Sequence, residues 1–166
     1  MVAQMRSNIK IDVNLEPLKK LAQNLKTSYI VKVGLIGAKG SSTHKDSGLS
    51  NAEIGAVHEF GSLSDKIPRR SFLQDTFFYK KDDLVKKIGQ IIEAGLEFEM
   101  TTEQVRKIYK LIGVYGEALV QEAFETGGFG KWKPLSQETI NNKGSSSILI
   151  DTGEMRKKIT SRIDKA

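Results

Sequence analysis

The sequence has no cysteine, and this absence excludes disulfide bonds and zinc sites built on cysteine. It also lacks any run of about 18 apolar residues, so no transmembrane helix is expected. Its first residues do not contain the apolar stretch of a secretory signal. Together these absences fit a protein that folds in a reducing cytoplasm and has no membrane partner.

The scarcity of histidine leaves little material for a catalytic centre, since only two histidines occur in 166 residues. His58 precedes Glu59, but the second histidine of the His-Glu-x-x-His zinc motif is missing. The glycine-rich segment 34–42 lacks the Gly-Lys-Ser/Thr order of a phosphate-binding loop. Asp82 and Asp83 are adjacent on an expected helix, so they do not face one side. We therefore predict that the protein is not an enzyme and has no catalytic residue, metal site or cofactor.

The formal net charge of +6 is compatible with an anionic partner such as DNA. Acidic and basic residues are interleaved through the middle of the chain, and only the last ten or so residues are clearly basic. This distribution favours solvated surface over nucleic-acid binding. Trp132 is favoured as a packing residue, although its neighbours Lys131 and Lys133 leave stacking on bases open.

Hydrophobic residues make up 39% of the chain and charged residues 28%, which is typical of globular proteins. We expect a single domain spanning residues 1–166. Residues 9–13 alternate apolar and polar and predict a strand, which Asn14 follows as a helix cap. The helix carries leucines on one side, and residues 29–36 read as a second, more buried strand.

The middle of the chain contains two capping-box patterns that mark helix starts. Ser50 with Glu53 opens a short helix to about residue 60, and Gly61 ends it. Thr101 with Gln104 separates two long amphipathic segments, about 72–98 and 103–125. Because the connection between these segments is short, we expect two antiparallel helices.

The remaining segments are expected to be short or irregular. Flexible loops are expected near 38–50 and 127–147, with one or two helical turns at 136–142. Residues 159–163 can add an edge strand. The predicted fold class is α+β: a small, mainly antiparallel sheet from both ends of the chain, packed against a long antiparallel helical hairpin, plus a short N-terminal helix.

Two composite motifs resemble those of a known family. Motif 1 consists of NAEIGAVHEFG (51–61) followed by IPRRSFL (67–73). Motif 2 consists of FGKWKPLS (129–136), then ILIDTGEM (148–155). In this order around two helices they are similar to signatures of phage virion morphogenesis proteins, a group that includes tail-completion, neck and head–tail joining proteins and the G-like proteins of Mu-type phages. Similar proteins often have proline after the arginine, where this chain has Ser71, which can cap the following helix instead.

The resemblance implies a structural protein of the virion, located at the head–tail junction or tail and in the host cytoplasm during assembly. Its partners would be further copies of itself, in a ring, and other neck or tail proteins, with non-specific DNA contact possible in a lumen. Tail completion, neck formation and tail termination remain open as its role. The alternatives are a nucleic-acid-binding module and a hydrolase or nuclease that uses His58 and Glu59.

Seven residues are assigned roles under this interpretation. Phe60, Phe72 and Trp132 are expected to be packing anchors that hold the motifs to the helices. The candidates for polar contacts with a neighbouring protein are His58, Glu59, Arg69 and Arg70.

Overall fold

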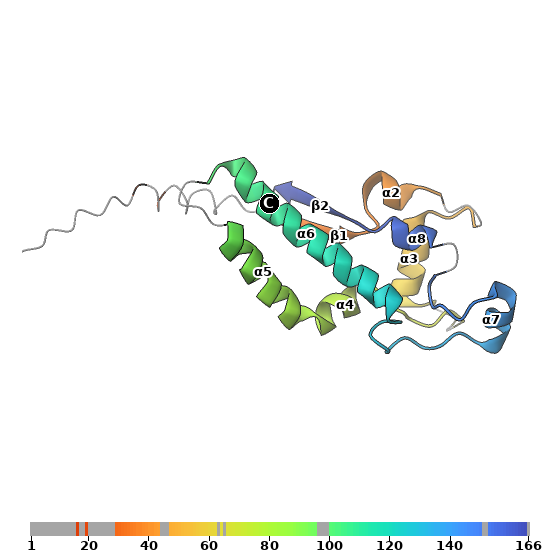
Figure 1. Cartoon of the computed structure of the whole chain (residues 1–166). Coiled ribbons are helices and arrows are strands. Elements are labelled where there is room, and N and C mark those ends of the chain that lie inside the picture. The colour runs from red at the N-terminus through yellow and green to blue at the C-terminus, as the bar shows by residue number, and fades with distance from the viewer. Residues whose placement is uncertain are drawn as a thin grey trace, which may run out of the picture.

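A computed structural model describes residues 16, 19, 29–43, 47–62, 64, 66–95, 100–150 and 153–165. The predicted strand at 9–13 and His44 lie outside these residues, and so does the predicted helix after Asn14 except for Glu16 and Lys19, which are helical. The elements follow one another along the chain (Figure 1) as β1 (Tyr29–Gly34), α2 (Gly37–Ser41), α3 (Asn51–Phe60), α4 (Gln74–Tyr79), α5 (Lys81–Gly95), α6 (Thr102–Glu125), α7 (Gln137–Lys143), α8 (Glu154–Lys157) and β2 (Thr160–Lys165). The protein therefore has the predicted α+β architecture.

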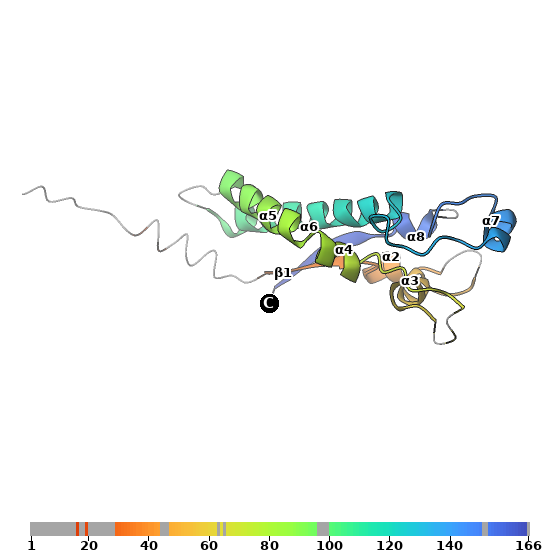
Figure 2. The same cartoon turned by 90° about the horizontal axis from the view of Figure 1, so that it is seen from below.

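The sheet joins segments from far apart in the sequence. β1 and β2 are antiparallel, and their register runs from Tyr29 opposite Lys165 to Gly34 opposite Thr160. One face of the pair carries the Lys32–Asp164 ion pair, with 2.8 Å between Nζ and Oδ2. The other face packs on α6, so the small sheet and the long helix form two layers (Figure 2).

Two glycines let the strands approach the backbone of α6 closely. A Cβ atom placed on Gly116 would lie 2.9 Å from Cγ2 of Val33. A Cβ atom on Gly113 would lie 2.7 Å from Oγ of Ser161. Both glycines are buried in the middle of a helix that they intrinsically weaken. These glycines therefore contribute to packing, because the absence of a Cβ atom leaves space for the side chains of the sheet.

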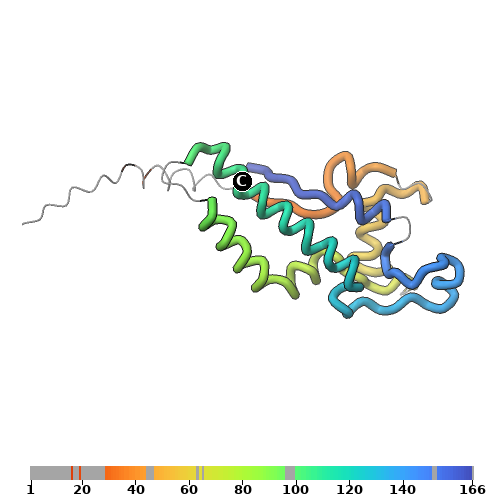
Figure 3. Tube along the Cα trace, in the orientation of Figure 1, coloured from red at the N-terminus to blue at the C-terminus, as the bar shows by residue number. Residues whose placement is uncertain are grey.

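α5 and α6 form the predicted antiparallel hairpin (Figure 3). The predicted helix over 72–98 is wrong in one respect, because it is divided at Lys80 into α4 and α5. Lys80 leaves helical geometry, with φ −100° and ψ 15°. Its ammonium group lies 2.7 Å from a carboxylate oxygen of Glu122 on α6, so the break is tied to the neighbouring helix.

The buried residues form two clusters along α6. The larger cluster lies where α6 ends, and its aromatic rings pack as Phe72 on Phe124 at 5.2 Å and Phe124 on Trp132 at 5.8 Å between centroids. The smaller cluster lies near the start of the same helix and contains Met100, Val105 and Ile108. The helix thus connects an aromatic end to an aliphatic end of the domain.

Local sequence signals identified the helix starts correctly. Both capping boxes are present, at Ser50 with Glu53 and at Thr101 with Gln104. α7 also agrees with the turns predicted at 136–142. The loop predicted over 38–50 is wrong in part, because residues 37–41 form α2 and Thr43 pairs with Ser50 in a β-bridge. Within the described ranges, no helix is both long and apolar enough to cross a bilayer.

Candidate functional site

Motif 1 and motif 2 meet beyond the end of α6, through contacts between residues more than 60 positions apart in the sequence. The indole Nε1 of Trp132 donates a hydrogen bond to the carbonyl oxygen of Ser71 at 3.2 Å. The guanidinium of Arg70 donates to two carbonyl oxygens of motif 2, Lys133 at 3.0 Å and Pro134 at 3.3 Å. Each motif therefore donates hydrogen bonds from a side chain to backbone carbonyl oxygens of the other motif, and these bonds hold the two segments together.

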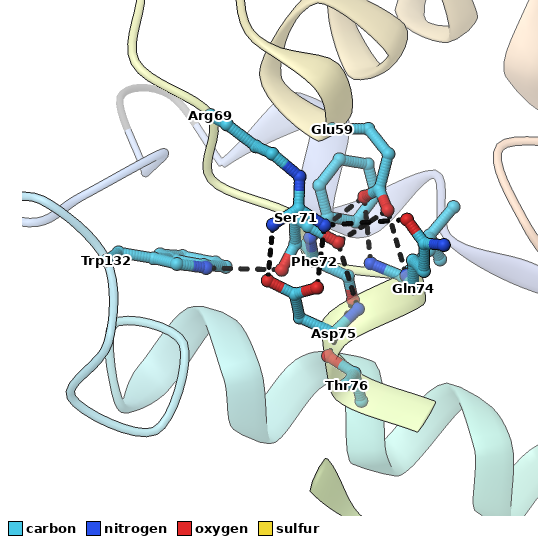
Figure 4. Close-up of polar contacts among 9 residues, drawn as sticks. Glu59, Arg69, Ser71, Phe72, Gln74, Asp75, Thr76 and Trp132 are labelled. Carbon is cyan, nitrogen blue, oxygen red and sulfur yellow. Dashed lines mark hydrogen bonds and ion pairs between the residues drawn. The ribbon is translucent and has the colours of Figure 1, made fainter. Parts of the chain in front are cut away.

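Glu59 organises motif 1 from a buried position at the end of α3 (Figure 4). Its Oε1 atom accepts from Ser71 Oγ at 2.6 Å and from the backbone N–H of Gln74 at 2.8 Å. Its Oε2 atom accepts from the N–H groups of Phe72 at 2.9 Å and Leu73 at 3.0 Å. The carboxylate thus satisfies donors that the start of α4 leaves without helical partners, and it does so where negative charge is favoured.

Ser71 and Arg69 extend this network on its other side. Ser71 Oγ accepts from the N–H of Asp75 at 2.9 Å while it donates to Glu59. The N-cap of α4 is Leu73, so the prediction that Ser71 is the cap is wrong, although its hydroxyl binds one N–H group of the first turn. The guanidinium of Arg69 meets both carboxylate oxygens of Asp75, at 2.8 and 2.6 Å. This hydrogen bond to Asp75 raises the pKa of Arg69 above its usual value. The turn before α4 is therefore held on both sides.

A cleft of about 880 Å³ lies between the two motifs. Apolar side chains on its walls come from both motifs, for example Ile54 and Leu149. Three lysines also line it, Lys66, Lys133 and Lys143, whereas Glu154 is the single carboxylate among the described lining residues. The described part of the cleft thus combines apolar walls with a net positive charge.

His58 lies on the wall of this cleft and is half-buried. Burial lowers its pKa below the usual value of 6.5, and the positive charge of Arg70 lowers it further. The Nδ1 atom is buried and has no hydrogen-bond partner among the described residues. The lowered pKa keeps the side chain neutral at neutral pH, and no described carboxylate binds Nδ1 to orient the ring as a catalytic base.

The expected packing anchors divide into two correct residues and one wrong one. Phe72 and Trp132 are buried, with 1% and 7% of their surface exposed. Phe60 is 71% exposed, so the prediction that it anchors motif 1 within this chain is wrong. It is the last residue of α3, and the buried positions of that helix are Asn51, Gly55 and Glu59.

The expected interface residues differ in exposure. Glu59 and Arg70, 5% and 6% exposed, use their polar groups inside the protein, although Arg70 also lines the cleft. Their contact with a neighbouring protein stays a prediction. Arg69 is exposed beside α4, and His58 is half-buried on the wall of the cleft, so part of each side chain is accessible to a partner. Trp132 is enclosed with its N–H group occupied, which removes the stacking role left open for it.

The arrangement offers a shaped surface and few reactive groups. In the part of the chain that the structure describes, no three His, Cys, Asp or Glu residues are grouped to hold a metal ion. Comparison with known proteins adds no further constraint, since no family model, no curated protein and no solved structure matches the chain. The geometry fits the binding of a chain segment in the cleft.

Proposed function

We propose that this protein is a structural component of a phage virion that acts at the head–tail junction by associating with copies of itself and with neck or tail proteins. The observation that carries the proposal is the union of motifs 1 and 2, the segments that resemble the virion morphogenesis family, around one cleft. Hydrogen bonds of Glu59, Arg70 and Trp132 fix the backbone of the two motifs beside this cleft. A rigid recess of this kind is suited to receiving part of another protein.

Exposed apolar side chains support the same proposal. Large hydrophobic residues are exposed on several elements, including Phe60 on α3, Phe78 on α4 and Leu111 on α6. Such surfaces in an assembling protein become buried between subunits. Because they lie on different elements, they fit a heterologous contact, in which one surface meets a different surface of the next copy and a ring can close.

Sedimentation velocity over a range of concentrations tests the proposal, with the chain alone and with candidate neck and tail proteins. We expect concentration-dependent assembly that Lys66→Glu and Lys133→Glu weaken, because both lysines line the cleft. Lys157→Glu is the matched control, since Lys157 is exposed on α8 and does not line the cleft. A chain that stays monomeric alone and with every virion partner contradicts the proposal.

The lysines of the cleft favour a second candidate, a module that binds nucleic acid. Binding to the phosphate backbone releases counterions, so the affinity for a DNA duplex of arbitrary sequence would fall steeply with salt. Lys133→Glu would then weaken DNA binding and reduce the salt dependence, while Lys157→Glu would have a smaller effect. Absence of binding at low salt eliminates this candidate.

A further inference from the structure

A second cavity, of about 480 Å³, is almost wholly apolar and lies away from the cleft between the motifs. It is lined by Val31 and Val33 of β1, by one stripe of α5 and by Ile112 of α6. The stripe of α5 consists of Leu84, Ile88 and Ile92, at successive turns of the helix. None of the described residues that line this apolar groove is charged.

The groove lies beside an unpaired edge of the sheet. Within the described residues β1 pairs only with β2, so its other edge presents backbone N–H and C=O groups. α5 extends beyond that edge, on the side of β1 away from β2 (Figures 1 and 2). No residue of α5 is buried, although its apolar stripe faces the groove. The layer beneath α5 therefore has room for one more strand beside β1.

We propose that residues 9–13 of the same chain occupy this groove as a third strand, parallel to β1 and hydrogen-bonded to its free edge. Ile9, Ile11 and Val13 alternate with Lys10 and Asp12, as suits a strand with one buried and one solvated face. The apolar set faces α5, and the charged set faces the solvent on the side where Lys32 and Asp164 form their ion pair.

The length of the intervening chain fits this arrangement. Residues 14–28 separate the segment from β1, and a parallel connection needs a dozen or more residues, usually as a helix. The entry point also fits, because Tyr29 at the start of β1 packs against Tyr109 at 5.1 Å between centroids, and Tyr109 lines the groove.

The tether favours the chain's own segment over that of a neighbouring copy. A short linker gives a tethered segment an effective concentration in the millimolar range, well above that of free protein in solution. The inference is independent of the proposed function. Its consequence is that the edge of β1 is closed within the monomer and is unavailable for pairing with other strands.

The absence of cysteine allows a direct test by disulfide cross-linking of the full-length chain. Ile11→Cys is combined in turn with Leu84→Cys, Ile88→Cys and Ile92→Cys, and each pair is oxidised. A disulfide requires Cα atoms within about 7 Å, so only a side chain that faces α5 can form one. Lys10→Cys with the same three partners is the matched control, because residue 10 points to the other face.

We expect at least one Ile11 pair to cross-link within a single chain while the three Lys10 pairs do not. Failure of all three Ile11 pairs, equal cross-linking from position 10, or products formed only between two chains would each overturn the proposal. Hydrogen exchange on the unmodified protein gives a second measurement that needs no variant. The β1 amides that point away from β2 should be protected, and exchange at the rate of unstructured amides would also overturn the proposal.

Discussion

Replacing Glu59 by glutamine tests whether the buried carboxylate stabilises the fold through the start of α4. The substitution preserves size and shape but leaves one oxygen in place of two. It also presents an NH₂ group to donors that already point at this position. Two of the four donors, which come from Ser71, Phe72, Leu73 and Gln74, then lose their acceptor.

The cost follows from the burial of these donors. A buried donor left without a partner costs about 1–3 kcal/mol, so two cost roughly 2–6 kcal/mol. That is a large fraction of the 5–15 kcal/mol of net stability typical of a domain of roughly this size. In urea unfolding we expect the midpoint to fall by about 1–3 M at unchanged slope.

The control is Glu53→Gln, the same change on the same helix. Glu53 is exposed and accepts from the N–H and Oγ of Ser50 in the capping box. Glutamine also serves at this position of a capping box, so the expected loss is below about 1 kcal/mol. Equal losses at both positions, or a loss at Glu59 below about 1 kcal/mol, would refute the role assigned to the buried carboxylate.

Three further predictions follow from the same region. The pKa of His58 is lower in the folded protein than in the unfolded chain, so the unfolded chain takes up a proton first as pH falls, and stability should decrease below about pH 6.5. Urea midpoints at several pH values measure this decrease, and His58→Gln should reduce it. Phe60→Ser should leave the free energy of unfolding in urea within about 0.5 kcal/mol of wild type but weaken assembly in sedimentation velocity, because the ring is exposed. Gly128→Ala should destabilise the protein by about 1–3 kcal/mol in urea unfolding, since a Cβ atom there would collide with the indole of Trp132, whereas Gly130→Ala, with a similar positive φ and no neighbour, should cost less.

Features set by neighbours in the sequence were predictable. Each capping box depends on two residues three positions apart, and both were found where expected. A small, mainly antiparallel sheet from both ends of the chain was expected, whereas the direct pairing of β1 with β2 was not predicted. The hairpin followed from the helical period of its two segments and their short connection.

Features set by distant residues were not predictable from the sequence alone. The partners of Glu59 lie 12 to 15 positions away, and those of Arg70 lie 63 and 64 positions away. Charged side chains are expected at the surface when only the sequence is known, so Glu59 and Arg70 were both assigned to an interface. Phe60 was assigned to the core by its apolar character, yet the helix ends at that residue and directs other positions inward.

The pairing of Gly34 with Thr160 also has a consequence for the order of folding. The helices α5 and α6 touch across a short connection, so their contact can form within a small part of the chain. The sheet closes a loop that encloses nearly all the helices, and the chain entropy lost in such a closure must be recovered by contacts already present. We therefore expect refolding in which helix signals in circular dichroism recover before the Lys32–Asp164 side of the sheet becomes protected from hydrogen exchange. A variant that loosens the glycine-lined face of α6 should lengthen the interval between these two phases.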